Sequence, residues 1–89
     1  MGFKLKIFDM KNILVENIDK LHTTKMGEDR ILRNLKLENC DVVVYCKNKI
    51  LSEKAQIYKK WKNRYCEVEN IEITINSYSY TIITAHMIK

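Results

Sequence analysis

Residues 55–89 read AQIYKKWKNRYCEVENIEITINSYSYTIITAHMIK, and apolar and polar side chains alternate along much of this stretch. Such alternation is typical of β-strands, because successive side chains of a strand point to opposite faces of the sheet. The segments WKNR and NSYS interrupt the alternation and are expected to be turns, with Asn63 in a left-handed conformation in the first. The pattern predicts strands over residues 55–60, 65–68, 71–75 and 80–88.

The parity of the apolar residues predicts a break between the second and third of these strands. Cys66 and Val68 have even numbers, whereas the isoleucines of residues 71–75 have odd numbers. One continuous strand cannot place both sets on the same face, because its side chains alternate with a period of two. We therefore expect Glu69 and Asn70 to form a tight turn or a bulge.

The last strand is expected to divide its side chains between the core and the opposite face of the sheet. Its odd-numbered residues carry no ionisable group, so we expect them to face the helices. Thr84 and His86 then point to the other face, together with Glu72 and Thr74 of the preceding strand. The inward set is Thr81, Ile83, Ala85 and Met87.

The chain before residue 55 has apolar residues at helical spacing and is expected to form helices. The first ends near His22, the second spans residues 25–35, and the third covers residues 40–51. Residue types that cap helix N-termini precede each of them. In chain order these caps are Asp9, Thr23 or Thr24, and Asn39 or Asp41.

Together these elements predict an α+β fold, in which two or three N-terminal helices pack on one face of a three- to four-stranded antiparallel sheet. The 89 residues are expected to form a single domain, residues 1–89, with a helical layer over residues 10–52 and the sheet over residues 55–89. Residues 1–9 contain the alternating sequence FKLKIF and are expected to be an extension or an added edge strand.

The composition is that of a globular protein, with 46% hydrophobic residues. No apolar run approaches the ~20 residues that span a bilayer, and no secretory signal is recognisable, so we expect a cytoplasmic location and no membrane partner. The residues Cys40, Cys46 and Cys66 lack the spacing of zinc ligands or of a redox pair. We expect them to be packed thiols, and we expect neither a metal nor another cofactor.

A formal net charge of +5 suggests an acidic partner. The hairpin segment YKKWKNRYC, residues 58–66, interleaves cations with aromatic rings, a combination that attracts phosphates and stacks on unpaired bases. The alternative is an exposed hairpin whose lysines keep the sheet edge soluble while Trp61 anchors it to the core. The candidate nucleic-acid-binding residues are Lys59, Lys60, Trp61, Lys62, Arg64, Tyr65 and, on the last strand, Thr84.

His86 and Arg64 are the candidate catalytic residues. A histidine can transfer protons near neutral pH, and an arginine can clamp a phosphate, which together suffice for acid–base cleavage of RNA. The two could act together only if the hairpin folds beside the last strand. The alternative is a structural histidine whose hydrogen bonds are satisfied within the fold.

Two classes of function follow from these residues. The first is an RNA-binding module, of which a toxin-type ribonuclease would be one form. The second is a protein-interaction module without catalytic activity, such as a small regulator, an antitoxin-like partner or a phage-encoded inhibitor, which would dock on an acidic protein surface. A homodimer is compatible with both, because an open edge strand invites pairing. No sequence motif fixes a reaction, so the sequence leaves open whether the protein is an enzyme.

The segments ILVENIDKLHTTKMGEDRILRNL, DVVVYCKNKI, WKNRYCEV and IEITINSYSYTIITAH resemble a family of short bacterial proteins known only as a domain of unknown function. Trp61 stands where members of that family more often carry glycine. More distantly, the order of elements and the SYTIITAH ending are similar to the barnase, colicin and RelE-like nucleases. That resemblance implies an antiparallel α+β fold and RNA cleavage. It points to Lys62, Arg64, Thr84 and His86.

Overall fold

The computed structural model describes residues 13–88, so the expected extension over residues 1–9 and the cap Asp9 lie outside the described part. Residues 13–16 are helical and are followed by a short 3-10 helix, two α-helices and four strands. These elements are η1 (Ile18–Lys20), α2 (Lys25–Leu35), α3 (Val42–Ile50), β1 (Gln56–Lys60), β2 (Asn63–Val68), β3 (Ile71–Asn76) and β4 (Ile82–Met87).

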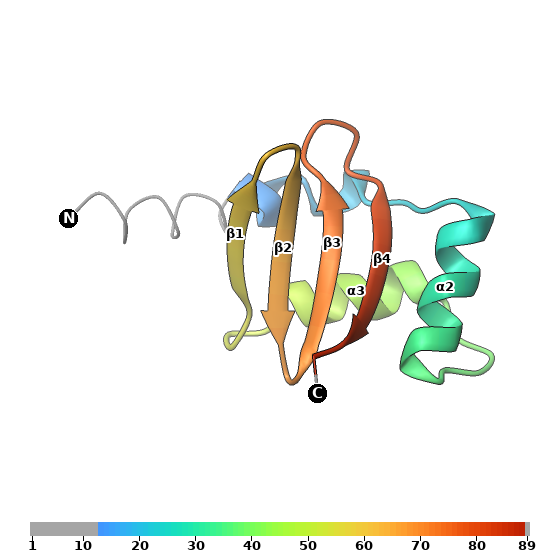
Figure 1. Ribbon diagram of the computed structural model, residues 1–89. Coiled ribbons are helices and arrows are strands. Elements are labelled where there is room, and N and C mark those ends of the chain that lie inside the picture. The colour runs from blue at the N-terminus through green and yellow to red at the C-terminus, as the bar shows by residue number, and fades with distance from the viewer. Residues whose placement is uncertain (1–12, 89) are drawn as a thin grey trace.

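The strands form an antiparallel sheet in the order β1-β2-β3-β4, which confirms the predicted α+β class (Figure 1). Glu69 and Asn70 connect β2 to β3 with φ angles of 52° and 67°. Positive φ at both central residues defines a type I′ turn, whose twist matches that of the flanking strands. The tight turn predicted from the parity of the apolar residues is therefore confirmed.

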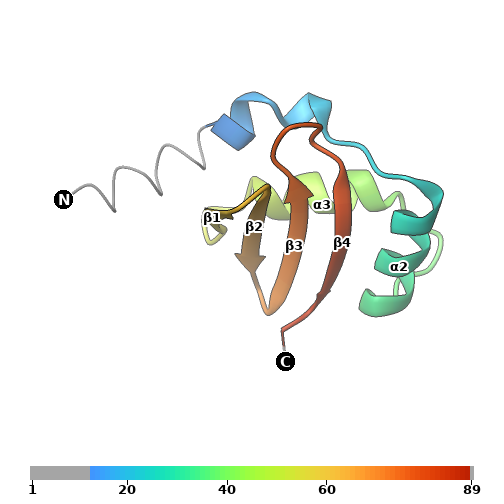
Figure 2. The ribbon, with the colours of Figure 1, turned by 45° about the horizontal axis from the view of Figure 1, so that its top comes forward.

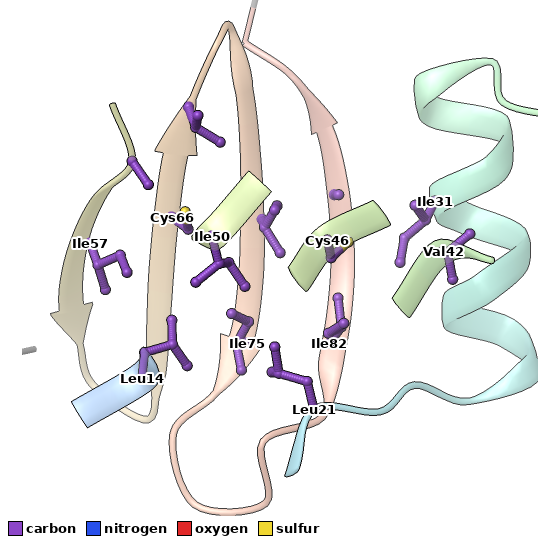
Figure 3. Packing of buried hydrophobic residues seen from close by; sticks show 14 residues of the cluster. Leu14, Leu21, Ile31, Val42, Cys46, Ile50, Ile57, Cys66, Ile75 and Ile82 are labelled. Atoms are coloured by element: carbon purple, nitrogen blue, oxygen red, sulfur yellow. The ribbon is translucent and has the colours of Figure 1, made fainter. Parts of the chain in front are cut away.

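One face of the sheet is covered by α3, and no helix within residues 13–88 covers the other (Figures 1 and 2). Cys46 and Ile50 of α3 are completely buried against the sheet, where Ile57, Cys66 and Ile75 belong to the same core (Figure 3). We call the opposite side the uncovered face. The strand register places Gln56, Tyr58, Lys60, Asn63, Tyr65, Glu67, Glu72, Thr74, Asn76, Thr84 and His86 there.

The helix α2 lies beside β4, at the edge of the sheet, and not on the face as predicted (Figures 1 and 2). The Thr24 side chain caps it by accepting a hydrogen bond from the backbone of Gly27. Thr23 Oγ1 donates to the backbone oxygen of Ile82 at 2.7 Å, and Asn34 Nδ2 donates to that of Ala85 at 3.2 Å. The polar groups of an edge strand need partners, and side chains around α2 supply them here.

The inward set predicted for the last strand is partly wrong because β4 contains a bulge. The register shifts between Thr74 and Ile75, which pair with Thr84 and Ile82, and Ile83 is left without a partner across the strands. Ile82 is therefore the fully buried residue, whereas Ile83 is half-buried. Ala85 is buried as expected, but Met87, also predicted to be covered, is exposed. The placement of Thr84 and His86 on the uncovered face is confirmed.

The first helix does not continue to His22 as predicted. The α-helical part stops after residue 16, only the 3-10 helix η1 follows it up to Lys20, and Asn17 Nδ2 donates to the backbone oxygen of Ile13 at 2.7 Å. A side-chain amide that bonds the backbone in this way competes with regular helix hydrogen bonds. His22 instead forms a parallel bridge with Thr81. Within residues 13–88, no helix has the length and apolar character needed to cross a membrane.

Cys46 is expected to react much more slowly with a thiol reagent than Cys40. Burial raises the pKa of the Cys46 thiol to about 12, so the reactive thiolate is scarce at neutral pH, whereas Cys40 is half-buried. Mass spectrometry after brief alkylation at pH 8 should find the label on Cys40 first. Labelling of Cys46 at the same rate would show that the core opens as fast as the reagent reacts.

Candidate nucleic-acid interface

The turn between β1 and β2 presents a tryptophan to solvent. Lys60 pairs with Asn63, so Trp61 and Lys62 form the turn. Trp61 has a φ of 60°, in the left-handed region that bulky residues rarely adopt, and it is 86% exposed. The prediction of a left-handed Asn63 is therefore wrong, because that residue lies within β2. Trp61 also does not anchor the hairpin to the core.

A shallow hollow of about 280 Å³ lies beside this turn. It opens on the uncovered face, because the strand residues that line it have their side chains there. Its walls combine ammonium groups, aromatic rings and an amide, which suits a ligand with both negative charge and a flat ring. The lining residues are Lys60, Trp61, Lys62, Asn63 and Tyr65. We refer to this set as the hairpin hollow.

Tyr65 is held in place by a second tyrosine on the neighbouring strand. Tyr58 lies directly opposite it in the register, and the ring centroids are 5.3 Å apart with an angle of 20° between the planes. Stacked aromatic pairs of this kind contribute about 0.5–1.5 kcal/mol beyond their buried area. The pair therefore gives the hairpin hollow a rigid wall on the side of the sheet.

The far end of the uncovered face is acidic. Glu67 and Glu72 lie opposite each other on β2 and β3, and the Tyr58 hydroxyl donates to Glu72 Oε2 at 2.9 Å. Burial, followed by this bond to Glu72, raises the pKa of the Tyr58 hydroxyl. His86 Nε2 lies 3.5 Å from Glu72 Oε1. Because carboxylates repel phosphates, an anionic ligand would be favoured at the opposite end of the face, which carries the turn between β1 and β2.

The structure does not bring Arg64 and His86 into one site. Arg64 lies opposite Ile75 on the core side of the sheet and is only 8% exposed, and its Nε has no hydrogen-bond partner. His86 lies on the uncovered face, on the far side of the sheet from Arg64. Thr84 shares that face, but Thr74 separates it from Tyr65, so it does not line the hairpin hollow.

Comparison with known proteins gives one match. A model of the family described as "Protein of unknown function (DUF3781)" covers residues 15–86, which is most of the chain. The chain belongs to the DUF3781 family. The resemblance to a domain of unknown function is thus confirmed, and the hairpin hollow lies within the DUF3781 segment. No curated protein and no solved structure matches the chain, so the similarity to nucleases stays a prediction.

Sequence reasoning missed two features of this DUF3781 chain. The segment NSYS was read only as a turn, although the loop between β3 and β4 lies at the same end of the sheet as the turn between β1 and β2 (Figure 1) and carries Tyr78, which is 74% exposed. The acidic pair was also missed. Its signal was available, because Glu67 and Glu72 flank the predicted turn at equal distances and therefore meet across the two strands.

Proposed function

We propose that this protein binds single-stranded nucleic acid, and RNA in particular, at the hairpin hollow. The observation that carries the proposal is the exposed indole of Trp61, held in a left-handed turn between Lys60 and Lys62. A bulky residue in that conformation is strained, and strain of this kind clusters at binding sites. The indole does not belong to the hydrophobic core of the described residues, which leaves the ring open to a stacked base.

The chemistry of the hairpin hollow supports a nucleotide as that ligand. A base stacked on an aromatic side chain contributes about 1–3 kcal/mol to binding, and it does so for any sequence. Lys60 and Lys62 stand on either side of Trp61, where each can neutralise a phosphate next to the stacked base. The acidic pair Glu67 and Glu72 keeps the rest of the uncovered face from binding the same backbone.

The proposal covers binding and not cleavage. The acid–base pair expected from the sequence would need Arg64 beside His86, and these residues occupy opposite faces of the sheet. His86 Nε2 instead lies 3.5 Å from Glu72 Oε1, and that carboxylate repels a phosphate.

The Trp61→Ala variant tests the proposal directly. Loss of one stacked base should weaken binding of a fluorescently labelled oligouridylate by about 5- to 150-fold in an anisotropy titration. Lys25→Ala, which removes an exposed lysine of α2, serves as the control and should leave the affinity nearly unchanged. Because Trp61 is the single tryptophan of the sequence, quenching of the intrinsic fluorescence reports on the same site in the unmodified protein.

Two outcomes would contradict the proposal. One is the absence of any binding to RNA at low salt, where counterion release favours it most. The other is equal affinity of the unmodified protein and Trp61→Ala. If an acidic peptide then quenches Trp61 while RNA does not, the hairpin hollow belongs to a protein-interaction module, the other class expected from the sequence.

A further inference from the structure

The hairpin hollow opens on the uncovered face, at the end of the sheet that carries the turn between β1 and β2. On the other side of this end, the ring of Tyr78 is 74% exposed, and Lys59 Nζ lies 5.7 Å from its centroid. Successive residues of a strand point to opposite faces, so Lys59 and Lys60 carry positive charge to both sides of β1. Cations and exposed aromatic rings therefore continue around the end of the sheet.

A backbone hydrogen bond joins the loop that carries Tyr78 to the turn between β1 and β2. The backbone N–H of Ser77 donates to the backbone oxygen of Lys62 at 2.7 Å. Within the loop, Asn76 Oδ1 accepts from the backbone N–H groups of Tyr78 and Ser79, both at 2.9 Å. These bonds fix the position of Tyr78 relative to Trp61, although the two residues are far apart in the sequence.

Tyr78 differs from the tyrosines on the helical side of the protein. Tyr80 and Tyr45 are half-buried and pack against the hydrophobic core. Tyr78 makes no such contact, and its ring is met by a lysine whose charge can pair with a phosphate. Like Trp61, Tyr78 therefore has a ring that is open to stack on a base.

We propose that Tyr78 is a second base-stacking platform, and that a nucleic-acid strand bound in the hairpin hollow crosses the turn to reach it. Trp61 stacks one base, Tyr78 stacks a following base, and Lys59 and Lys62 neutralise the phosphates between them. The ligand is a single strand, because paired bases would not present their faces to rings on two sides of one turn. This inference rests on the proposed function and extends it to a site longer than one nucleotide.

A length series of oligouridylates tests the inference, from the mononucleotide to the hexanucleotide, with binding followed by quenching of Trp61. In the unmodified protein the affinity should rise once the ligand is long enough to reach Tyr78. In Tyr78→Ala the affinity for the mononucleotide should be unchanged, and the hexanucleotide should bind about 5- to 150-fold more weakly. Tyr78→Phe keeps the ring and should bind the hexanucleotide like the unmodified protein. The same series with deoxyribonucleotides shows whether the platform distinguishes RNA from DNA.

The two substitutions distinguish a failure of this inference from a failure of the proposed function. If Trp61→Ala weakens binding but Tyr78→Ala matches the unmodified protein at every length, the second platform is refuted and the hairpin hollow stands. If neither substitution changes binding, both proposals fall. Thermal unfolding of Tyr78→Ala monitors its fold, and a midpoint close to that of the unmodified protein assigns any loss of affinity to the missing ring.

Discussion

Replacing Ile82 by alanine is expected to destabilise the protein by about 2–5 kcal/mol, the range observed when buried isoleucines are truncated. Ile82 is completely buried and lies opposite Ile75 in the core (Figure 3). The truncation leaves a cavity in the core on the helical side of β3 and β4, because close-packed neighbours relax only in part. Urea unfolding followed by circular dichroism should show the loss as a lower transition midpoint with an unchanged slope.

Ile83→Ala is the matched control for this prediction. The two isoleucines are adjacent and chemically identical, but Ile83 is half-buried at the bulge of β4. Its truncation should cost about 1 kcal/mol or less, since it removes less buried surface. A regular strand without the bulge would place Ile83 inward and reverse the order of the two losses. Equal losses would also contradict the register described here.

Most of the secondary structure could be predicted because its signals are local. The caps Thr24 and Asp41 precede α2 and α3, and the parity of the apolar residues marked the turn at Glu69 and Asn70. The bulge in β4 has no such local signal. It occurs where Thr23, 59 positions earlier in the chain, bonds the backbone of Ile82. A contact between distant segments cannot be read from periodicity.

The candidate site could likewise be predicted from the sequence only in part. The candidate residues Lys60, Trp61 and Lys62 line one hollow, because neighbours at a hairpin turn remain neighbours in space. Arg64 was named a candidate for its charge, yet its side chain lies on the core side of the sheet. Its parity contained the correct information, since Arg64 is even-numbered like Cys66 and therefore faces the core. In a short strand the pleat decides which face a side chain occupies, even when the side chain is charged.

Gly27→Ala is expected to destabilise the protein by about 2 kcal/mol, although alanine in an exposed helix is favoured over glycine by about 1 kcal/mol. Gly27 is buried where α2 meets β4. A Cβ atom there would overlap Thr23 Oγ1 and would lie 3.2 Å from the backbone oxygen of Ile82. The Thr23 hydroxyl would have to leave its hydrogen bond to Ile82, and α2 would have to move away from the strand.

A double-mutant cycle with Thr23→Ala isolates the cause of that loss. Removing the threonine hydroxyl costs the bond to Ile82 but also clears the space that a Cβ at position 27 needs. The added cost of Gly27→Ala should therefore be smaller in the Thr23→Ala background, with a coupling of about 1 kcal/mol between the two sites. Strictly additive losses would mean that Thr23 does not limit the approach of the helix. A stabilising Gly27→Ala would mean that the Thr23 hydroxyl and the backbone of Ile82 move aside at little cost, so that the intrinsic helix preference prevails.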